Sequence, residues 1–119
     1  MLALSIVKPH GANIAEGRKT LEIRSWRPEE LPLRNLIIVE NSRYLTAEMP
    51  EEGNALAVAV VDIEEVHEWQ PDEVEAACSQ AWQPGYFAWK IANVRKINPP
   101  IAAPARRKLY ELEITVPLI

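Results

Sequence analysis

Residues 17–24 have the sequence GRKTLEIR, which predicts a turn glycine followed by a strand with two unlike faces. Side chains alternate along a strand, so the apolar Leu21 and Ile23 point to one side. The other side carries Thr20, Glu22 and Arg24, with Trp26 at the same parity. Lys19 lies where the strand geometry begins. This polar face is either an ordinary solvated surface of an antiparallel sheet or a polar site.

The composition fits one soluble globular domain that spans residues 1–119, with 48% hydrophobic and 25% charged residues. No run approaches the roughly 20 apolar residues of a membrane-spanning helix, and the N-terminus lacks the order of a signal peptide. We therefore expect a cytoplasmic protein without a membrane partner. The single cysteine, Cys78, excludes an internal disulfide, and His10 and His67 are too isolated for a metal cluster. We expect neither a metal nor a cofactor.

The net charge of −4 is distributed unevenly along the chain. Residues 1–46 contain seven basic and five acidic side chains, a balance of +2. Residues 47–82 contain ten acidic and no basic side chains, whereas residues 83–119 contain six basic and two acidic ones. If the two ends of the chain meet in space, one face of this acidic protein is basic.

The patterning predicts an α+β domain of six strands and two short helices, with a sheet closed or nearly closed into a small barrel. Strands are expected at residues 1–7, 20–26, 36–40, 55–66, 86–97 and 108–116. One helix is expected after Pro9 and a second at residues 70–82, where an apolar stripe has helical spacing. Residues 98–104 are expected to form a proline-rich link. The expected core includes Leu4, Ile6, Val58, Val60, Trp89 and Leu112.

Three segments resemble the ASCH domain family, which belongs to the PUA-like superfamily. They are LSIVKP at residues 4–9, the Gly-x-Lys-x-x-Glu-x-Arg pattern at residues 17–24, and FAWKIANV at residues 87–94. The resemblance covers nearly the whole chain. It implies a small PUA-like β-barrel of mostly antiparallel strands with two short helices. It also implies binding of RNA or a nucleotide in a cleft beside the barrel.

Some relatives in this family cleave nucleic acid, and a smaller group hydrolyses the amide of an acylated cytosine nucleoside. In that group a threonine nucleophile stands where this chain has Glu22, and its lysine corresponds to Lys19. A carboxylate does not replace a hydroxyl nucleophile in the same mechanism. Thr20 lies two residues earlier, about 7 Å away along a strand. In an enzyme, Lys19 and Glu22 would be the catalytic residues through proton transfer.

The hypothesis that we prefer is a binding module for RNA or a nucleotide. We expect residues 8–27 and the basic residues of 95–108 to border one cleft, and the acids of 48–75 to lie mostly elsewhere. The expected contacts to phosphate or base edges come from Lys8, His10, Lys19 and Arg24, with Glu22 beside them and Trp26 for stacking. Base–aromatic stacking contributes about 1–3 kcal/mol per base. The free N–H groups at the start of the first helix, beside Lys8 and His10, are a candidate anion site.

Three alternatives remain open. In the first, Glu22 and Arg24 only pair with each other on a solvated strand, an interaction of less than about 1 kcal/mol. In the second, the protein is a hydrolase of a modified nucleoside or of RNA, with an acid among Asp62, Glu64 and Glu65 facing the cleft. In the third, the acidic middle of the chain binds another protein. The missing hydroxyl at position 22 favours a binding module over an amidohydrolase.

Overall fold

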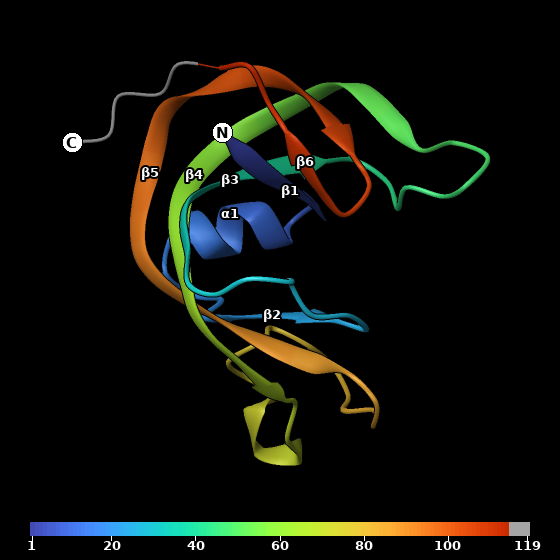
Figure 1. The fold of residues 1–119 in the computed structure, drawn as a ribbon, viewed down its shortest axis with the longest axis vertical. Helices are drawn as coiled ribbons and strands as arrows, with labels where there is room; N and C mark the ends of the chain where they lie inside the picture. The colour runs from blue at the N-terminus through green and yellow to red at the C-terminus, as the bar shows by residue number, and fades with distance from the viewer. Residues whose placement is uncertain (115–119) are drawn as a thin grey trace.

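The computed structural model describes residues 1–114 as one six-stranded sheet with the strand order β2-β5-β4-β3-β1-β6 (Figure 1). Its elements are β1 (Leu2–Val7), α1 (His10–Ala15), β2 (Leu21–Arg24), β3 (Leu33–Asn41), β4 (Glu51–Glu68), the 3-10 turn η1 (Pro71–Glu73), β5 (Phe87–Arg106) and β6 (Leu109–Glu111). All neighbouring strands are antiparallel except β1 and β3, which run parallel. The last expected strand extends beyond the described residues.

The long strands β4 and β5 form the curved wall of the molecule, and α1 lies on its concave side (Figure 1). Their pairing is interrupted by four register shifts, and such bulges bend a strand and increase its twist. The expected proline-rich link at 98–104 is wrong, because this segment continues β5. Pro99 and Pro100 lie between the pairs Ala59–Lys96 and Ala57–Ile101, at one of these shifts. Proline is tolerated there because the ladder hydrogen bond is already missing.

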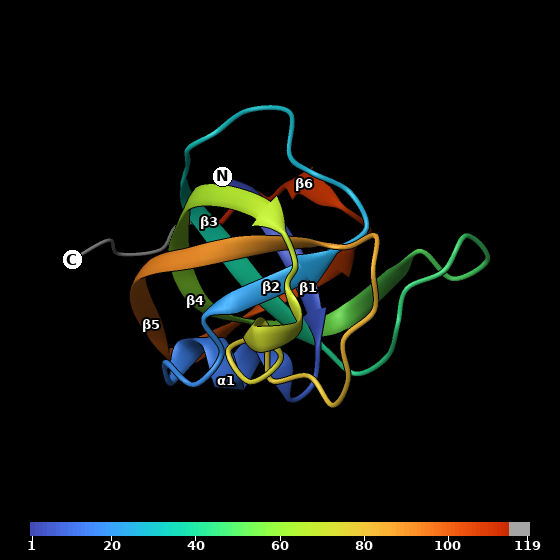
Figure 2. The same cartoon turned by 90° about the horizontal axis from the view of Figure 1, so that it is seen from below.

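The expected barrel closure is also wrong, because the sheet is open. Its edges are β2 and β6, which do not pair with each other. β6 pairs only with Leu2–Leu4 of β1, so the second half of β1 has no strand partner on that side. The curl of the sheet brings β2 opposite this unpaired edge (Figure 2). A side chain of β2 spans the gap. Arg24 Nη2 donates to Ser5 O at 2.8 Å.

The two expected helices have different outcomes. The first forms as α1, and Gly17 has φ +80°, the left-handed conformation expected after its last turn. The second, expected at 70–82, is wrong: only η1 forms, followed by turns. Ala76 O accepts hydrogen bonds from the backbone N–H groups of Thr20 and Leu21, and Ala77 O accepts one from Lys19. These tertiary bonds use carbonyls that a continued helix would need.

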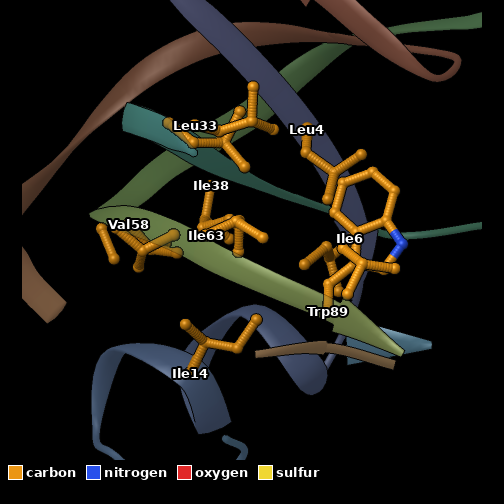
Figure 3. Packing of buried hydrophobic residues seen from close by; sticks show 12 residues of the cluster. Leu4, Ile6, Ile14, Leu33, Ile38, Val58, Ile63 and Trp89 are labelled. Carbon is orange, nitrogen blue, oxygen red and sulfur yellow. The ribbon is translucent and has the colours of Figure 1, made fainter. Parts of the chain in front are cut away.

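The expected core is confirmed, since all six predicted side chains are at most 8% exposed. One cluster packs sheet residues against α1, with Ile14 of the helix directed toward the side of the sheet that carries Val58 and Ile63 (Figure 3). A second cluster lies between β3, β4, β5 and β6. A third cluster joins Leu21 of β2 to Trp69 and Ala77, so the segment after β4 covers the apolar face of β2.

A buried carboxylate ties β3, β4 and β5 together. Asp62 Oδ1 accepts hydrogen bonds from Asn35 N at 3.0 Å and Arg95 Nη2 at 2.9 Å. Its Oδ2 accepts one from Asn93 Nδ2 at 2.8 Å, and Arg34 Nη1 lies 3.4 Å away. Burial raises the pKa of Asp62, but these hydrogen bonds and the charge of Arg95 outweigh it and lower the pKa to about 2. The charged form of Asp62 therefore stabilises the fold.

Candidate functional site

The polar face of the Gly-x-Lys-x-x-Glu-x-Arg strand is buried rather than solvated. Lys19 and Glu22 are only 4% and 7% exposed, because β2 has a covered face on each side. Its apolar side lies under the segment after β4, and its polar side points into the concavity of the sheet. The interpretation as an ordinary surface strand is therefore wrong. A buried charged pair requires internal partners, and β2 supplies them.

Lys19, Glu22 and Arg24 form one ion network. Glu22 Oε1 lies 3.4 Å from Lys19 Nζ, and Glu22 Oε2 accepts a hydrogen bond from Arg24 Nε at 2.8 Å. Lys19 Nζ also donates to Ala77 O, while Arg24 reaches across the gap to Ser5 O. A single carboxylate thus holds two cations in place, and the network as a whole keeps one positive charge.

His10 lies beside this network at the start of α1. Burial lowers the pKa of His10, and the charge of Lys19 lowers it further, against smaller opposite effects of Glu22 and Glu40. Its ring is therefore neutral at pH 7. His10 Nδ1 is buried and has no hydrogen-bond partner among the described residues. A neutral ring with a free Nδ1 can accept or donate a hydrogen bond, according to its tautomer.

The candidate anion site at the start of α1 is already occupied by the protein. Glu40 Oε2 accepts a hydrogen bond from Ala12 N at 2.7 Å, which satisfies an N–H group that a ligand would need. Gly11 permits this approach, since a Cβ at position 11 would lie 2.7 Å from Glu40 Cβ. Lys8 is exposed and does not line the cleft beside the network. The binding role expected of Lys8 and of this helix start stays a prediction.

A cleft of about 910 Å³ opens between β2, the unpaired half of β1 and the turn that connects β5 to β6. Five cationic side chains line it: Lys19, Arg24, Arg106, Arg107 and Lys108. Within residues 1–114, Glu22 is the one acidic side chain in its wall. Residues between Pro9 and Trp26 thus share this cleft with three basic residues of the expected range 95–108, namely Arg106, Arg107 and Lys108. Arg95 and Lys96 lie outside it.

None of the three acids proposed from the long strand faces the cleft. Asp62 is enclosed by its own partners, while Glu64 bonds to Arg34 and Glu65 to His67 on other parts of the surface. Among the described residues no group of three or more histidine, cysteine, aspartate or glutamate side chains is arranged to hold a metal ion. Within that part of the chain, no helix is long and apolar enough to cross a membrane.

Four aromatic side chains line the cleft: Trp26, Tyr44, Trp69 and Tyr86. Trp26 packs edge-on against the buried Trp89, with ring centroids 4.9 Å apart, and Lys108 Nζ lies 5.5 Å from the centre of the Trp26 ring. Tyr44, in the loop before β4, is 78% exposed, and Tyr86 lies just before β5. Sequence reasoning identified Trp26 but not the two tyrosines. Their only signal was their residue type in a loop.

The cleft is lined by the hydroxyl groups of five residues, of which Ser5 and Ser79 form hydrogen bonds within the protein; the others are Ser25, Tyr44 and Tyr86. Thr20 is exposed and does not line the cleft. Ser5 Oγ lies 3.1 Å from Tyr110 Oη and accepts a hydrogen bond from Arg106 N at 3.1 Å. Ser79 Oγ donates to Ala81 O at 3.0 Å. These contacts leave Lys19 beside a carboxylate rather than beside the hydroxyl of Thr20, Ser5 or Ser79.

The curled, mostly antiparallel sheet with its cleft is consistent with a PUA-like β fold. Residues 4–101 match the model of the ASCH domain, so this chain belongs to the ASCH domain family. A comparison with curated proteins finds no significant match. Among solved structures, two mutant forms of ZmASCH from Zymomonas mobilis are similar. Each is 16% identical with a TM-score of 0.49, and the alignments cover 85% of this chain and 74% or 72% of theirs.

Proposed function

We propose that this protein binds RNA or a nucleotide in the cleft beside β2. The observation that carries the proposal is the charge of that cleft: five cations and one carboxylate line it, on a chain whose net charge is −4. Such a concentration of positive charge attracts phosphate groups even when the whole protein is acidic. Membership of the ASCH family adds support, because PUA-like domains often bind RNA.

The cleft divides into a floor and a rim with different chemistry. In the floor, Glu22 already neutralises part of the charge of Lys19 and Arg24, so this region suits a polar base edge. At the rim, Arg107 is exposed and has no ion-pair partner among residues 1–114, which leaves it available to phosphate. Trp26 and Tyr44 offer surfaces for stacking. We assign bases to the floor and the backbone to the rim.

Binding fits these residues better than amide hydrolysis. The carboxylate of Glu22 is engaged with two cations, and a carboxylate does not perform the hydroxyl's role in the threonine mechanism. Thr20, the nearest hydroxyl in sequence, is exposed and does not line the cleft. The same experiments should nevertheless include a search for product, because Lys19 and the neutral His10 lie together.

The test is fluorescence anisotropy with a labelled single-stranded RNA at several salt concentrations. Each phosphate contact contributes about 0.7 to the slope of log affinity against log salt for a single strand. Arg107→Ala should therefore weaken binding and reduce this slope by about that amount. Lys90→Ala is the matched control, since Lys90 is an exposed cation of β5 outside the cleft.

The proposal fails if wild type and the Arg107 variant bind RNA equally and without salt dependence, or if the Lys90 variant loses as much affinity. Cleavage of the RNA, or release of the acyl group from an acylated cytidine, would replace the binding module with a hydrolase. In that case Lys19→Ala and Glu22→Ala should each abolish turnover.

A further inference from the structure

A second cavity, of about 340 Å³, lies behind the wall of the cleft. Its lining combines four aromatic rings with one acidic side chain: Glu68, Trp69, Gln70, Trp82, Pro84, Gly85, Tyr86 and Phe87. These residues come from the end of β4 and from the segment that leads into β5. Trp69 and Tyr86 contribute to both the cavity and the cleft, so these two rings separate them.

The hydrogen-bond donors of this lining are largely used inside the protein. Trp69 Nε1 donates to Glu73 O, and Trp82 Nε1 donates to Trp69 O at 2.8 Å. Gln70 Nε2 donates to Glu68 O. What the cavity offers a ligand is therefore aromatic surface rather than N–H groups. The negative face of an aromatic ring attracts a cation within about 6 Å of its centre.

The charge around the cavity is negative, in contrast to the cleft. Glu68 is exposed, and its carboxylate has no ion pair within the described part of the chain. Residues 64–75 hold six acidic and no basic side chains. A neighbouring contact has the same chemistry: the Arg27 guanidinium lies 5.4 Å from the centre of the Phe87 ring. Of the other three rings, Trp69 is only 6% exposed, Trp82 is half-buried and Tyr86 is exposed.

We propose that this cavity binds a methylated ammonium group, held between the aromatic rings and the carboxylate of Glu68. The volume is within the usual range for small-molecule sites, roughly 300–1,000 Å³. A quaternary ammonium suits the site because it needs no hydrogen-bond acceptors and gains from both the rings and the charge. This site is chemically opposite to the cleft, which attracts anions.

The test is a proton NMR titration of the protein with choline and with its neutral isostere 3,3-dimethylbutan-1-ol. The choline methyl resonance should move upfield through the ring currents, and choline should bind about 2- to 30-fold more tightly than the isostere. Glu68→Gln should remove most of that preference. Glu48→Gln is the matched control, an exposed acid in the loop before β4 that does not line the cavity.

Trp82→Leu tests the aromatic contribution, with circular dichroism as a check of its fold, and it should abolish the upfield shift. If that variant does not fold, the comparison of the two ligands and the Glu68 variant still decides. Equal affinity for choline and the isostere would show a merely apolar cavity and overturn the proposal. An unchanged choline affinity in Glu68→Gln, or the same loss in Glu48→Gln, would overturn it as well.

Discussion

Replacing Asp62 by asparagine should destabilise the protein in a way that depends on pH. The change keeps the shape of the side chain and removes its charge. If the new NH2 group takes the place of Oδ2, it faces the amide donor of Asn93, whereas Arg95 still bonds to the carbonyl oxygen at the position of Oδ1, now without the full negative charge. Asn35 N could still donate to the remaining carbonyl oxygen. The lost interaction is therefore mainly that between the charged carboxylate and its cationic and amide partners.

The size of the effect follows from the pKa of Asp62. The folded protein lowers this pKa from 3.8 to about 2, and the side chain is 9% exposed, so little is screened by solvent. Each pKa unit corresponds to about 1.4 kcal/mol, which gives about 2 kcal/mol of stability at pH 7. Because the folded pKa is depressed, this contribution is complete above about pH 4–5. It is lost as the pH falls through about 2, where the carboxyl becomes protonated in the folded state too.

Urea denaturation followed by circular dichroism between pH 7 and pH 2 measures this directly. The difference in free energy of unfolding between wild type and the asparagine variant should be about 2 kcal/mol or more at pH 7 and should shrink between pH 4 and pH 2. Glu64→Gln is the control, since the pair of Glu64 with Arg34 is half exposed and should contribute less than about 1 kcal/mol. A difference that stays constant down to pH 2 would refute the electrostatic origin.

Two further substitutions test the surroundings of the site. Gly11→Ala should lower the free energy of unfolding, measured in urea, by about 1–3 kcal/mol, because the new Cβ would lie 2.7 Å from Glu40 Cβ. Gly53→Ala is the control: its Cβ would have nothing within 4 Å, so the free energy of unfolding should change by less than about 0.5 kcal/mol. By NMR, His10 should titrate with a midpoint below pH 6.5, and Lys19→Met should raise that midpoint. The contribution of the neutral ring to stability is complete above pH 6.5 and decreases as the pH falls below 6.5. If Lys19→Met leaves the midpoint of His10 unchanged, the charge of Lys19 does not lower the pKa of this ring.

The strands and the core could be predicted from sequence because alternation is a local signal. Apolar residues at every second position of a strand are predicted to be buried, and Leu4 and Trp89 are buried. The helix expected at 70–82 failed for a non-local reason: the carbonyls of Ala76 and Ala77 bond to the chain around Lys19. The closed barrel failed because β2 is short and pairs only with Phe87–Lys90. Neither these hydrogen bonds nor the limited pairing of β2 can be recognised in the local sequence pattern.

The candidate site was predictable where its residues share one strand. Glu22 and Arg24 meet because strand parity places them on one face, and Lys19 joins them from the preceding turn. Lys8 does not line the cleft, and the sequence could not show this, because an exposed lysine and a lysine of the cleft have the same sequence signal. Tyr44 and the turn at Arg106–Lys108 reach the cleft only through the curl of the sheet. Their proximity depends on long-range geometry.

The open edge of the sheet and its polar strand have a common physical cause. A small closed barrel fills its interior with side chains. Lys19 and Glu22 are already buried, so enclosing Arg24 as well would add a further desolvation penalty. The gap leaves Arg24 partly exposed, and Arg24 donates a hydrogen bond to the carbonyl oxygen of Ser5. The same side chains thus hold the two sides of the gap together and form the floor of the cleft. Loss of ligand affinity on changing Arg24 must therefore be measured beside stability, because one contact serves both roles.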